Sequence, residues 1–424
     1  MLRHAGLLGM GGLVIIAALA TGEAYVFFLL YLAALVLGAA YLLARRGLSD
    51  LEAGSWPDRE QSTVGDVLTV TYTLRNRSRL PKPWLEVHSP STLPLVIPGR
   101  ALAMMPRTAR SWAARVPLTE RGQFRMDPMI VRTGDPFGLF ESVASVGPGA
   151  AVLVYPQVEP LPRWRLPPAP VEGTTSRPEH TPHQTPLATS VRPYTPGDAF
   201  NRIHWRSSAR HQELQVKEYD VEQTADVWLY VDLERSRHVG EGDAATIETA
   251  VRAAAAIGSA ALDEGRGVGI EAVGARHSLI SIDRGTRQRQ KIMGLLAVLQ
   301  PEGVVSLAEM LAEGAPRMYR GTVVVAITPS LDPAWVRPLA ALRERGVSAV
   351  ACFVDPLSHA ERSLAAQQVA VPDAVLSDRL RRDRRALQHA LAEHDVPCHT
   401  LVAGVPLAEQ LLSVRTADGA AGRR

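Results

Sequence analysis

The N-terminal part of the chain contains two uninterrupted apolar runs, at residues 5–20 and 24–44. The second run has about 20 residues, enough for a helix to cross the ~30 Å hydrocarbon layer of a bilayer. The short polar break between the runs leaves room only for a tight turn. The pattern therefore predicts a two-helix transmembrane anchor over residues 1–47.

Basic residues at both ends of this anchor set its predicted orientation. Arg3 precedes the first run, and Arg45 and Arg46 follow the second. Because cytoplasmic loops carry an excess of Lys and Arg, both ends are expected to face the cytoplasm. Residues 18–20 also resemble a signal-peptidase site, and cleavage there would leave the second span in place. We expect a two-pass protein of the cell (inner) membrane whose soluble domains are cytoplasmic.

Short alternating apolar runs, broken by Pro and Gly, fill residues 48–158. The predicted strands cover residues 67–76, 84–89, 111–118, 129–134 and 151–156. Strands at this spacing, without a long helical pattern between them, favour an all-β, sandwich-like domain. Residues 159–190 are rich in Pro, Thr and His and lack periodicity, so we interpret them as a linker.

From residue 225 the pattern changes to strands that alternate with helices. Predicted strands cover 226–233, 267–274, 277–283, 321–329, 347–354 and 396–402, and predicted helices cover 244–265, 286–300, 332–345 and 373–394. This alternation indicates βαβ units and an α/β, doubly wound, mostly parallel sheet. The α/β domain is expected to span residues 191–414, followed by a disordered tail at 415–424.

Composition narrows the classes of function. A net charge of +3 is slight for 424 residues and argues against a dedicated nucleic-acid binder. Cys352 and Cys398 are the only cysteines, and their spacing suits neither a metal site nor a disulfide framework. The sequence has no nucleophile elbow, Walker loop or zinc-protease motif, so we predict that the protein is not an enzyme.

The densest group of chemically active side chains, which we call the signature segment, lies at residues 191–219. Its candidate partner-binding or structural residues are Tyr194, Gly197, Asp198, Arg202, His204, Trp205, Arg206 and Arg210. If Asp198 caps a helix, the three arginines fall on one face at i, i+4 and i+8. They would form either a receptor for anions or half of an internal ion-pair network, and the acids at 213–222 favour the network. We expect His204 to be half-buried and hydrogen-bonded, and Tyr194 and Trp205 to anchor the segment to the α/β domain.

A second motif lies in the β-rich region. It contains Arg121, Gly122, Asp135, Pro136, Phe137 and Gly138. These residues are expected at turns, with a structural first role and with Phe137 packing at the edge of the sandwich. The two motifs together resemble those of the "domain of unknown function 58" family. The resemblance implies a membrane-anchored protein with a von Willebrand A-like domain and a MoxR-type AAA+ ATPase as its partner.

The resemblance to a von Willebrand A-like domain also implies a Mg²⁺ site after the first strand of the sheet, built from Asp-x-Ser-x-Ser. Asp232 and Ser236 match that pattern, but Glu234 replaces the first Ser. After the central strand, Pro329 stands where the pattern has a carboxylate. Two interpretations stay open: a reduced Mg²⁺ site at Asp232 and Ser236, or a structural Asp232 that caps a helix or pairs with an arginine.

These observations favour a membrane-anchored, non-enzymatic scaffold or adaptor. Its cytoplasmic α/β domain would present a surface to a protein partner, a MoxR-type AAA+ ATPase, in a chaperone-like assembly or maturation role. It would contact membrane lipid through the N-terminal hairpin. The alternative is a metal-dependent ligand-binding receptor module of von Willebrand A type.

Overall fold

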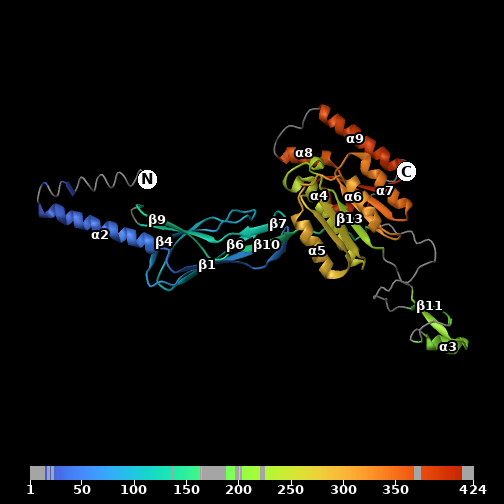
Figure 1. The fold of residues 1–424 in the computed structure, drawn as a ribbon, viewed down its shortest axis with the longest axis horizontal. Coiled ribbons are helices and arrows are strands. Elements are labelled where there is room, and N and C mark those ends of the chain that lie inside the picture. The colour runs from blue at the N-terminus through green and yellow to red at the C-terminus, as the bar shows by residue number, and fades with distance from the viewer. Residues whose placement is uncertain are drawn as a thin grey trace. The chain divides into compact units, whose positions relative to one another are not determined.

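The computed structural model describes residues 15–16, 20, 23–135, 138–162, 164, 188–195, 200, 203–219, 225–366 and 374–412. The chain forms two compact units (Figure 1). The first unit comprises Met1–Val158 with Met293–Leu299, and the second comprises Glu159–Ile292 with Gln300–Arg424. The predicted linker at 159–190 and the tail at 415–424 fall almost entirely outside the described residues.

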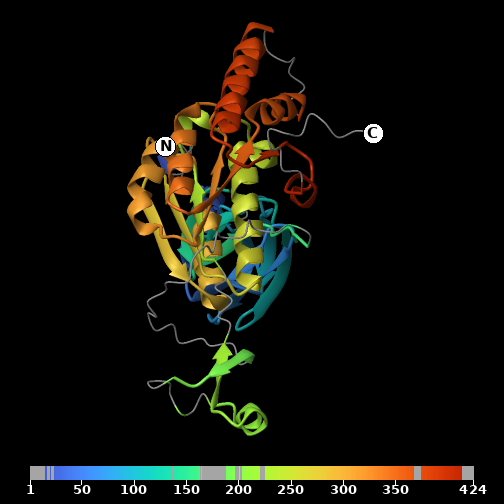
Figure 2. The same ribbon diagram turned by 90° about the vertical axis from the view of Figure 1, so that its right-hand side faces the viewer.

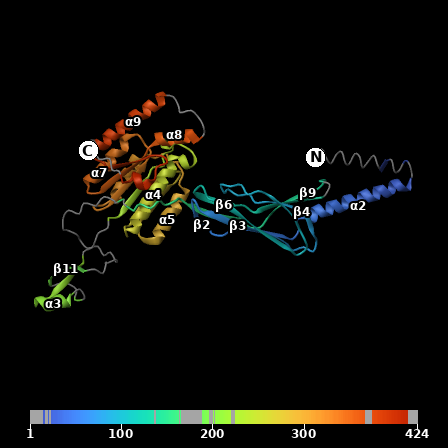
Figure 3. The same ribbon diagram turned by 180° about the vertical axis from the view of Figure 1, so that it is seen from behind.

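The first unit begins with the apolar helix α2 (Ala24–Arg46). By length and composition α2 could cross a membrane, and it is the one such helix among the described residues. Most of the first predicted span lies outside those residues, so the structure describes a single apolar helix where the sequence predicted a two-helix hairpin. The end of α2 packs beside β8 and β9 of the following domain (Figure 3).

The β-rich domain after α2 has ten strands in three sheets. The strands are β1 (Leu51–Pro57), β2 (Gln61–Thr63), β3 (Val67–Asn76), β4 (Lys82–His88), β5 (Arg100–Met104), β6 (Ala109–Pro117), β7 (Gly122–Met126), β8 (Met129–Gly134), β9 (Glu141–Val146) and β10 (Ala150–Tyr155). The sheets have the orders β1-β3-β6, β2-β10-β7 and β5-β4-β8-β9. All five predicted strands are present, and the mostly β character of this region is confirmed.

Strand β3 shows how the alternating pattern builds the core of this domain. Leu68, Val70, Tyr72 and Leu74 are fully buried, while the residues between them face outward. Side chains of a strand point alternately to its two faces, so one apolar stripe supplies one inner face. The strands that the sequence pattern missed include β5 and β9, whose residues are mostly exposed and carry no apolar stripe.

The second unit contains a six-stranded sheet with helices on both faces. Its strands are β13 (Val227–Val231), β14 (Val268–Val273), β15 (His277–Asp283), β16 (Val323–Thr328), β17 (Ser348–Val354) and β18 (Cys398–Leu401). The α-helices are α4 (Thr246–Asp263), α5 (Gly285–Val298), α6 (Leu307–Gly314), α7 (Val336–Glu344), α8 (Pro356–Ala366), α9 (Ala374–Glu393) and α10 (Leu407–Gln410). Short 3₁₀ helices are η2 (Arg235–Arg237), η3 (Gly242–Ala244), η4 (Ala315–Arg317) and η5 (Pro333–Trp335).

The strand order of this sheet is β15-β14-β13-β16-β17-β18, and only β15 runs antiparallel. Helix α4 lies on one face of β13, and α6 and α7 lie on the other (Figures 1 and 2). The predicted mixed α/β sheet is therefore confirmed. Because the chain leaves β13 and β16 toward opposite sides of the sheet, the crevice where ligands bind in doubly wound folds lies between the carboxyl ends of these two strands.

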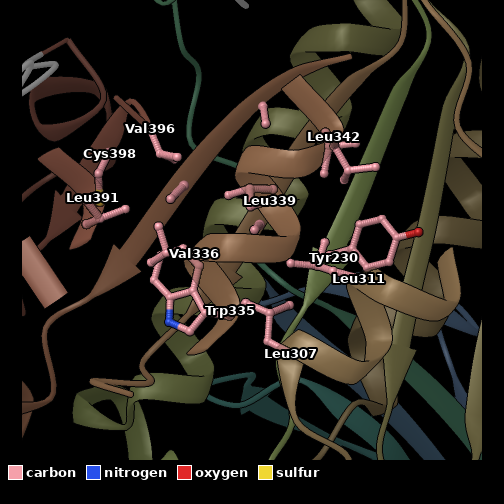
Figure 4. Packing of buried hydrophobic residues seen from close by; sticks show 14 of the residues in the cluster. Tyr230, Leu307, Leu311, Trp335, Val336, Leu339, Leu342, Leu391, Val396 and Cys398 are labelled. Atoms are coloured by element: carbon pink, nitrogen blue, oxygen red, sulfur yellow. The ribbon is translucent and has the colours of Figure 1, made fainter. Parts of the chain in front are cut away.

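The core on the α6–α7 face is continuous across the sheet (Figure 4). Tyr230 and Leu311 meet at one end, and Leu391 and Val396 pack at the other. Trp335 lies between them with 2% of its surface exposed, and its Nε1 donates to the Ser330 carbonyl at 3.3 Å. This tryptophan joins the loop after β16 to the core.

Truncation of Trp335 tests this core. We expect Trp335→Ala to lower the free energy of unfolding of the α/β domain by about 3–5 kcal/mol, because the change leaves a large cavity. The measurement is pulse proteolysis of the full-length protein in detergent over a urea series. Trp56→Ala, which removes a ring that is 53% exposed on β1, should change it by no more than about 0.5 kcal/mol. An equal loss of unfolding free energy in the two variants would contradict the assignment of Trp335 to the core of the α/β domain.

Candidate functional site

The signature segment forms a small β-ribbon with a short helix inside it. Strands β11 (Ala188–Pro193) and β12 (Gln215–Tyr219) pair antiparallel, and helix α3 (Trp205–His211) lies between them. Ile203 bridges to Val216 just before the helix, and both side chains are buried. These two residues form the apolar centre of the ribbon. The first three residues of β11 fall inside the predicted linker.

His204 holds the start of α3. Its backbone N–H donates to the Gln215 carbonyl at 2.8 Å, which ties the helix to β12. Its Nδ1 accepts from the backbone N–H of Ser207 at 3.3 Å and lies 2.7 Å from the Ser207 hydroxyl. The half-buried imidazole is thus a helix N-cap, in agreement with the prediction of a hydrogen-bonded His204.

The predicted helix from Asp198 is wrong in its position. Helix α3 begins at Trp205, because Ile203 is still in a β-bridge and His204 provides the cap. Arg202 therefore precedes the helix and cannot share a helical face with the later arginines. Gly197, Asp198 and Arg202 themselves lie outside the described residues. Arg206 and Arg210 keep their i, i+4 relation, and both are exposed.

Two aromatic side chains of the signature segment face solvent. Trp205 is 66% exposed and Phe200 is 71% exposed. Tyr194 is partly buried, and its ring centroid lies 6.1 Å from that of Phe200. The expectation that Trp205 anchors this segment is therefore wrong. Phe200, Trp205, Arg206 and Arg210 are the exposed aromatic and basic side chains of this segment, and we call them together the signature surface.

The carboxyl edge of the sheet is built around Asp232, directly after β13. Only 1% of Asp232 is exposed. Its Oδ2 accepts from the Thr328 hydroxyl at 2.6 Å, and its Oδ1 accepts from the backbone N–H of Glu234 at 2.9 Å. Burial raises the pKa of this carboxyl group, and the hydrogen bond from Thr328 opposes the rise. The bond to Thr328 closes the crevice between β13 and β16.

Arg237 neutralises the remaining acids at this edge. Its Nε lies 3.0 Å from Oε1 of Glu234, and a terminal nitrogen lies 3.3 Å from Oδ2 of Asp332. Ser236, the second predicted ligand, donates its hydroxyl to Glu234. Sequence reasoning missed Arg237, although its i+3 spacing from Glu234 on a short helical turn was a readable signal.

These contacts do not fit the Mg²⁺ site that the resemblance implied. Mg²⁺ needs several oxygen ligands in an octahedral arrangement. Both carboxylate oxygens of Asp232 accept hydrogen bonds from protein donors, and the Ser236 hydroxyl donates to the Glu234 carboxylate. Among the described residues, no group of three or more His, Cys, Asp or Glu is arranged to hold a metal ion. The structure therefore favours the structural interpretation of Asp232.

His238 holds the loop after β13 to helix α4. Its Nε2 donates to the backbone carbonyl of Asp232 at 2.9 Å, and its Nδ1 lies 3.0 Å from the Thr246 hydroxyl at the start of α4. Burial lowers the pKa of His238. The neutral imidazole with its proton on Nε2 satisfies both contacts, so this histidine is a structural link between the β13 loop and α4.

The second motif contains Asp135 and Gly138, which lie in a closed loop of the first unit. The Phe140 backbone N–H donates to Oδ1 of Asp135 at 2.6 Å, and the Gly138 N–H donates to the Asp135 carbonyl at 3.1 Å. Gly138 has a φ of +67°, which favours glycine. The structural role predicted for Asp135 and Gly138 agrees with this geometry. Pro136 and Phe137 lie outside the described residues.

Arg121 belongs to a different part of the same unit. It is buried, and its Nε and a terminal nitrogen donate to the backbone carbonyls of Leu296 and Leu299 at 3.0 and 2.6 Å. Gly122 follows it as the first residue of β7. The second motif is therefore two separate structural elements of the first unit.

The pH dependence of stability tests the role of His238. Its folded pKa is lowered, so its contribution is present above the unfolded value near 6.5 and is lost as pH falls. We expect the melting temperature of the α/β domain to fall between about pH 7.5 and pH 5. The fall should be smaller in His238→Gln, and part should persist because burial also lowers the pKa of His359. Parallel pH profiles for the two proteins would contradict this role.

A metal titration tests the closed carboxyl edge. We expect no dose-dependent rise in melting temperature when Mg²⁺ or Mn²⁺ is added to the full-length protein, because Arg237 and Thr328 already satisfy the acids. A ligand at about 100 times its dissociation constant would stabilise by roughly 2.7 kcal/mol. A rise that Asp232→Ala abolishes, and that an equal ionic strength of NaCl does not reproduce, would contradict the interpretation.

Comparisons with known proteins match the signature segment and the α/β domain. Residues 190–394 match the family model described as "Protein of unknown function DUF58", the family that the two motifs resemble. The chain is 29% identical over 301 residues to the "Uncharacterized protein YeaD" of Bacillus subtilis (strain 168), which covers 68% of this chain and 72% of that protein.

Solved structures give weaker similarities. A CARDB domain from Pyrococcus furiosus is 14% identical, covers 25% of this chain and 92% of its own, and has a TM-score of 0.21. Proximal thread matrix protein 1 from the mussel byssus is 11% identical, covers 40% of this chain and 47% of its own, and has a TM-score of 0.23. Scores this low carry no argument about function. The family match over residues 190–394 is the similarity that bears on this protein.

Proposed function

We propose that this chain is a membrane-anchored scaffold or adaptor of the DUF58 family, without enzymatic activity of its own. It uses the signature surface to bind a protein partner, a MoxR-type AAA+ ATPase, in a chaperone-like assembly or maturation role. Its α/β domain is von Willebrand A-like, and its anchor is the two-pass hairpin with the soluble domains in the cytoplasm. The identity of the partner rests on the family resemblance.

The observation that carries this proposal is the exposure of Trp205 beside Arg206. Trp, Tyr and Arg are enriched among the residues that dominate the binding energy of protein interfaces. Trp205 begins α3, and Arg206 and Arg210 are exposed on that helix. The helix is held in place by His204 and Ser208, whose hydroxyl accepts from the Gln215 N–H at 2.8 Å. The backbone of α3, which carries Trp205, Arg206 and Arg210, is thus tied to β12.

The charges of this surface favour an acidic and apolar complement. Arg206 and Arg210 form no ion pair with a described acid, and Glu213 is the one acid of the predicted internal network whose side chain is among those described. A partner that buries Trp205 and supplies carboxylates would gain both the apolar contact and charge-assisted hydrogen bonds.

The contacts among side chains at the carboxyl edge of the sheet support the same proposal. In many doubly wound domains this edge carries the ligand site. Here Thr328 and Arg237 satisfy Asp232, Glu234 and Asp332 internally. We therefore place recognition on the signature surface, and do not carry forward the metal-dependent receptor module of von Willebrand A type.

Cross-linking in the membrane tests the proposal. Tagged wild type and Trp205→Ala are cross-linked in cells, and partners are identified by mass spectrometry. We expect an AAA+ ATPase with wild type and at least a tenfold lower recovery with Trp205→Ala, because loss of an interface hot spot costs about 2 kcal/mol or more.

Trp56→Ala is the matched control, since Trp56 is 53% exposed but lies on β1 of the other unit. Its recovery of the ATPase should equal that of wild type. Equal recovery in all three proteins would remove the signature surface from the interface. If a protein of another class is recovered and its recovery depends on Trp205, the adaptor role would stand and the ATPase would be excluded as its partner.

A further inference from the structure

A cavity of about 720 Å³ lies in the first unit at the end of α2. It opens beside the last two turns of the helix and is closed by the segments around β4, β8 and β9. Its walls combine apolar, aromatic and charged side chains with backbone; they are Ala39, Leu42, Arg46, Gly47, Leu80, Pro81, Lys82, Pro83, Trp84, Thr133, Gly134, Asp135, Gly138 and Glu141. None of the functional roles proposed above involves this cavity.

Helix α2 is fixed against the β-rich domain at this point. Lys82 donates its Nζ to the backbone carbonyl of Arg46 at 2.6 Å, which satisfies one of the free carbonyls at the helix end. Ala40 and Ala44 are each 2% exposed. The ring of Tyr41 stands edge-on to that of Phe140, with centroids 5.5 Å apart. The cavity is therefore built by both elements.

The composition of α2 sets the depth of this cavity relative to a bilayer. Residues of α2 before Ala40 are almost all exposed and apolar, as lipid-facing residues are. Arg45 and Arg46 in its last turn mark the level of the headgroups. Trp84 is 41% exposed beside them, at the level where interfacial tryptophans gather. Membrane lipids are thus the molecules that surround the cavity mouth.

The charges inside the cavity include a cation with spare bonding capacity. Lys82 is 1% exposed, and an ammonium group has three donors. Two of them reach the Arg46 carbonyl and the Ser49 hydroxyl, the latter at 3.4 Å. Among the described residues Lys82 forms no ion pair, and burial lowers its pKa while Asp50 opposes that change. A buried cation without a paired anion is unfavourable, so an anionic group in the cavity would stabilise it.

The acids of the lining do not fill this need. Asp135 is committed to the Phe140 backbone N–H, and Glu141 is exposed at the start of β9. Leu42, Leu80 and the prolines leave the remaining wall apolar. A ligand that fits has one negatively charged group, an apolar body and a source in the bilayer.

We propose that this cavity binds a phospholipid of the surrounding bilayer. Its phosphodiester lies against the exposed Arg46, where the buried charge of Lys82 also attracts it, and the upper parts of its acyl chains lie along Leu42, Leu80 and Trp84. The inference rests on α2 being a membrane span, as in the proposed function, but it is independent of any protein partner. It would give the lipid a structural role in fixing the β-rich domain to the anchor.

Native mass spectrometry of the full-length protein, released from detergent, tests this site. Phosphatidylglycerol and phosphatidylethanolamine are added in separate titrations, with diacylglycerol as the phosphate-free probe. We expect one molecule of phospholipid to bind wild type at least tenfold more tightly than diacylglycerol. Lys82→Met should weaken phospholipid binding by about tenfold, because it removes a buried positive charge whose attraction for the phosphate is strong at low dielectric.

Two further variants keep the test decisive. Leu80→Trp fills the cavity from a side chain that is 47% exposed, and it should weaken binding whether or not Lys82→Met folds. Lys291→Met removes an exposed lysine of the other unit and should leave binding unchanged. Equal binding of diacylglycerol and phospholipid, or wild-type binding by Leu80→Trp, would overturn the proposal. Neither result would bear on the cross-linking of an ATPase.

Discussion

The hydrogen bond from Thr328 to the buried Asp232 joins the two central strands of the α/β sheet at their carboxyl ends. It spans the crevice where the chain reverses direction across the sheet, which is where doubly wound folds bind their ligands. Because this bond is 2.6 Å long and both residues are buried, the crevice is occupied by the protein's own side chains. The roles that we assign to the rest of this unit follow from that constraint.

Arg237 and His238 extend the closure to the loops. Arg237 binds the two acids that flank the crevice, and His238 holds the β13 loop to α4. The Arg237 guanidinium thus supplies the positive charge beside Glu234 and Asp332 that a bound divalent cation would otherwise supply. With the carboxyl edge satisfied, the recognition site that we propose for this unit is the signature surface at Trp205. In the first unit, Lys82 presents the opposite situation, a buried cation whose donors are not all used.

Much of the fold could be predicted from the apolar pattern. The strands of the α/β sheet and its four predicted helices appeared as continuous apolar or amphipathic runs, and β3 and β8 matched to the residue. Helix α6 was missed although Ser306 and Glu309 form a capping box, a signal that stands in the sequence. Strand β2 has only three residues, and β9 lacks an apolar stripe, so no pattern could reveal them.

The candidate site was harder to predict because its contacts join distant residues. The sequence placed Asp232 after β13 correctly, but its partner Thr328 is 96 positions away. The helix in the signature segment was placed too early because Pro196–Gly197 and Asp198 looked like a helix start. The pairing of Ile203 with Val216 delays the start of α3 until Trp205, and long-range pairing of this kind overrides a local signal.

Hydrogen–deuterium exchange of the full-length protein in lipid nanodiscs, with and without its cross-linked partner, tests the central claim most directly. The account predicts that the partner slows exchange in α3 and the adjoining strands of the signature segment. It also predicts that the loops at residues 232–238 and 328–332 exchange equally in both states, because their polar groups are already bonded within the domain. Protection of those two loops, without protection of α3, would contradict it and return recognition to the carboxyl edge of the sheet.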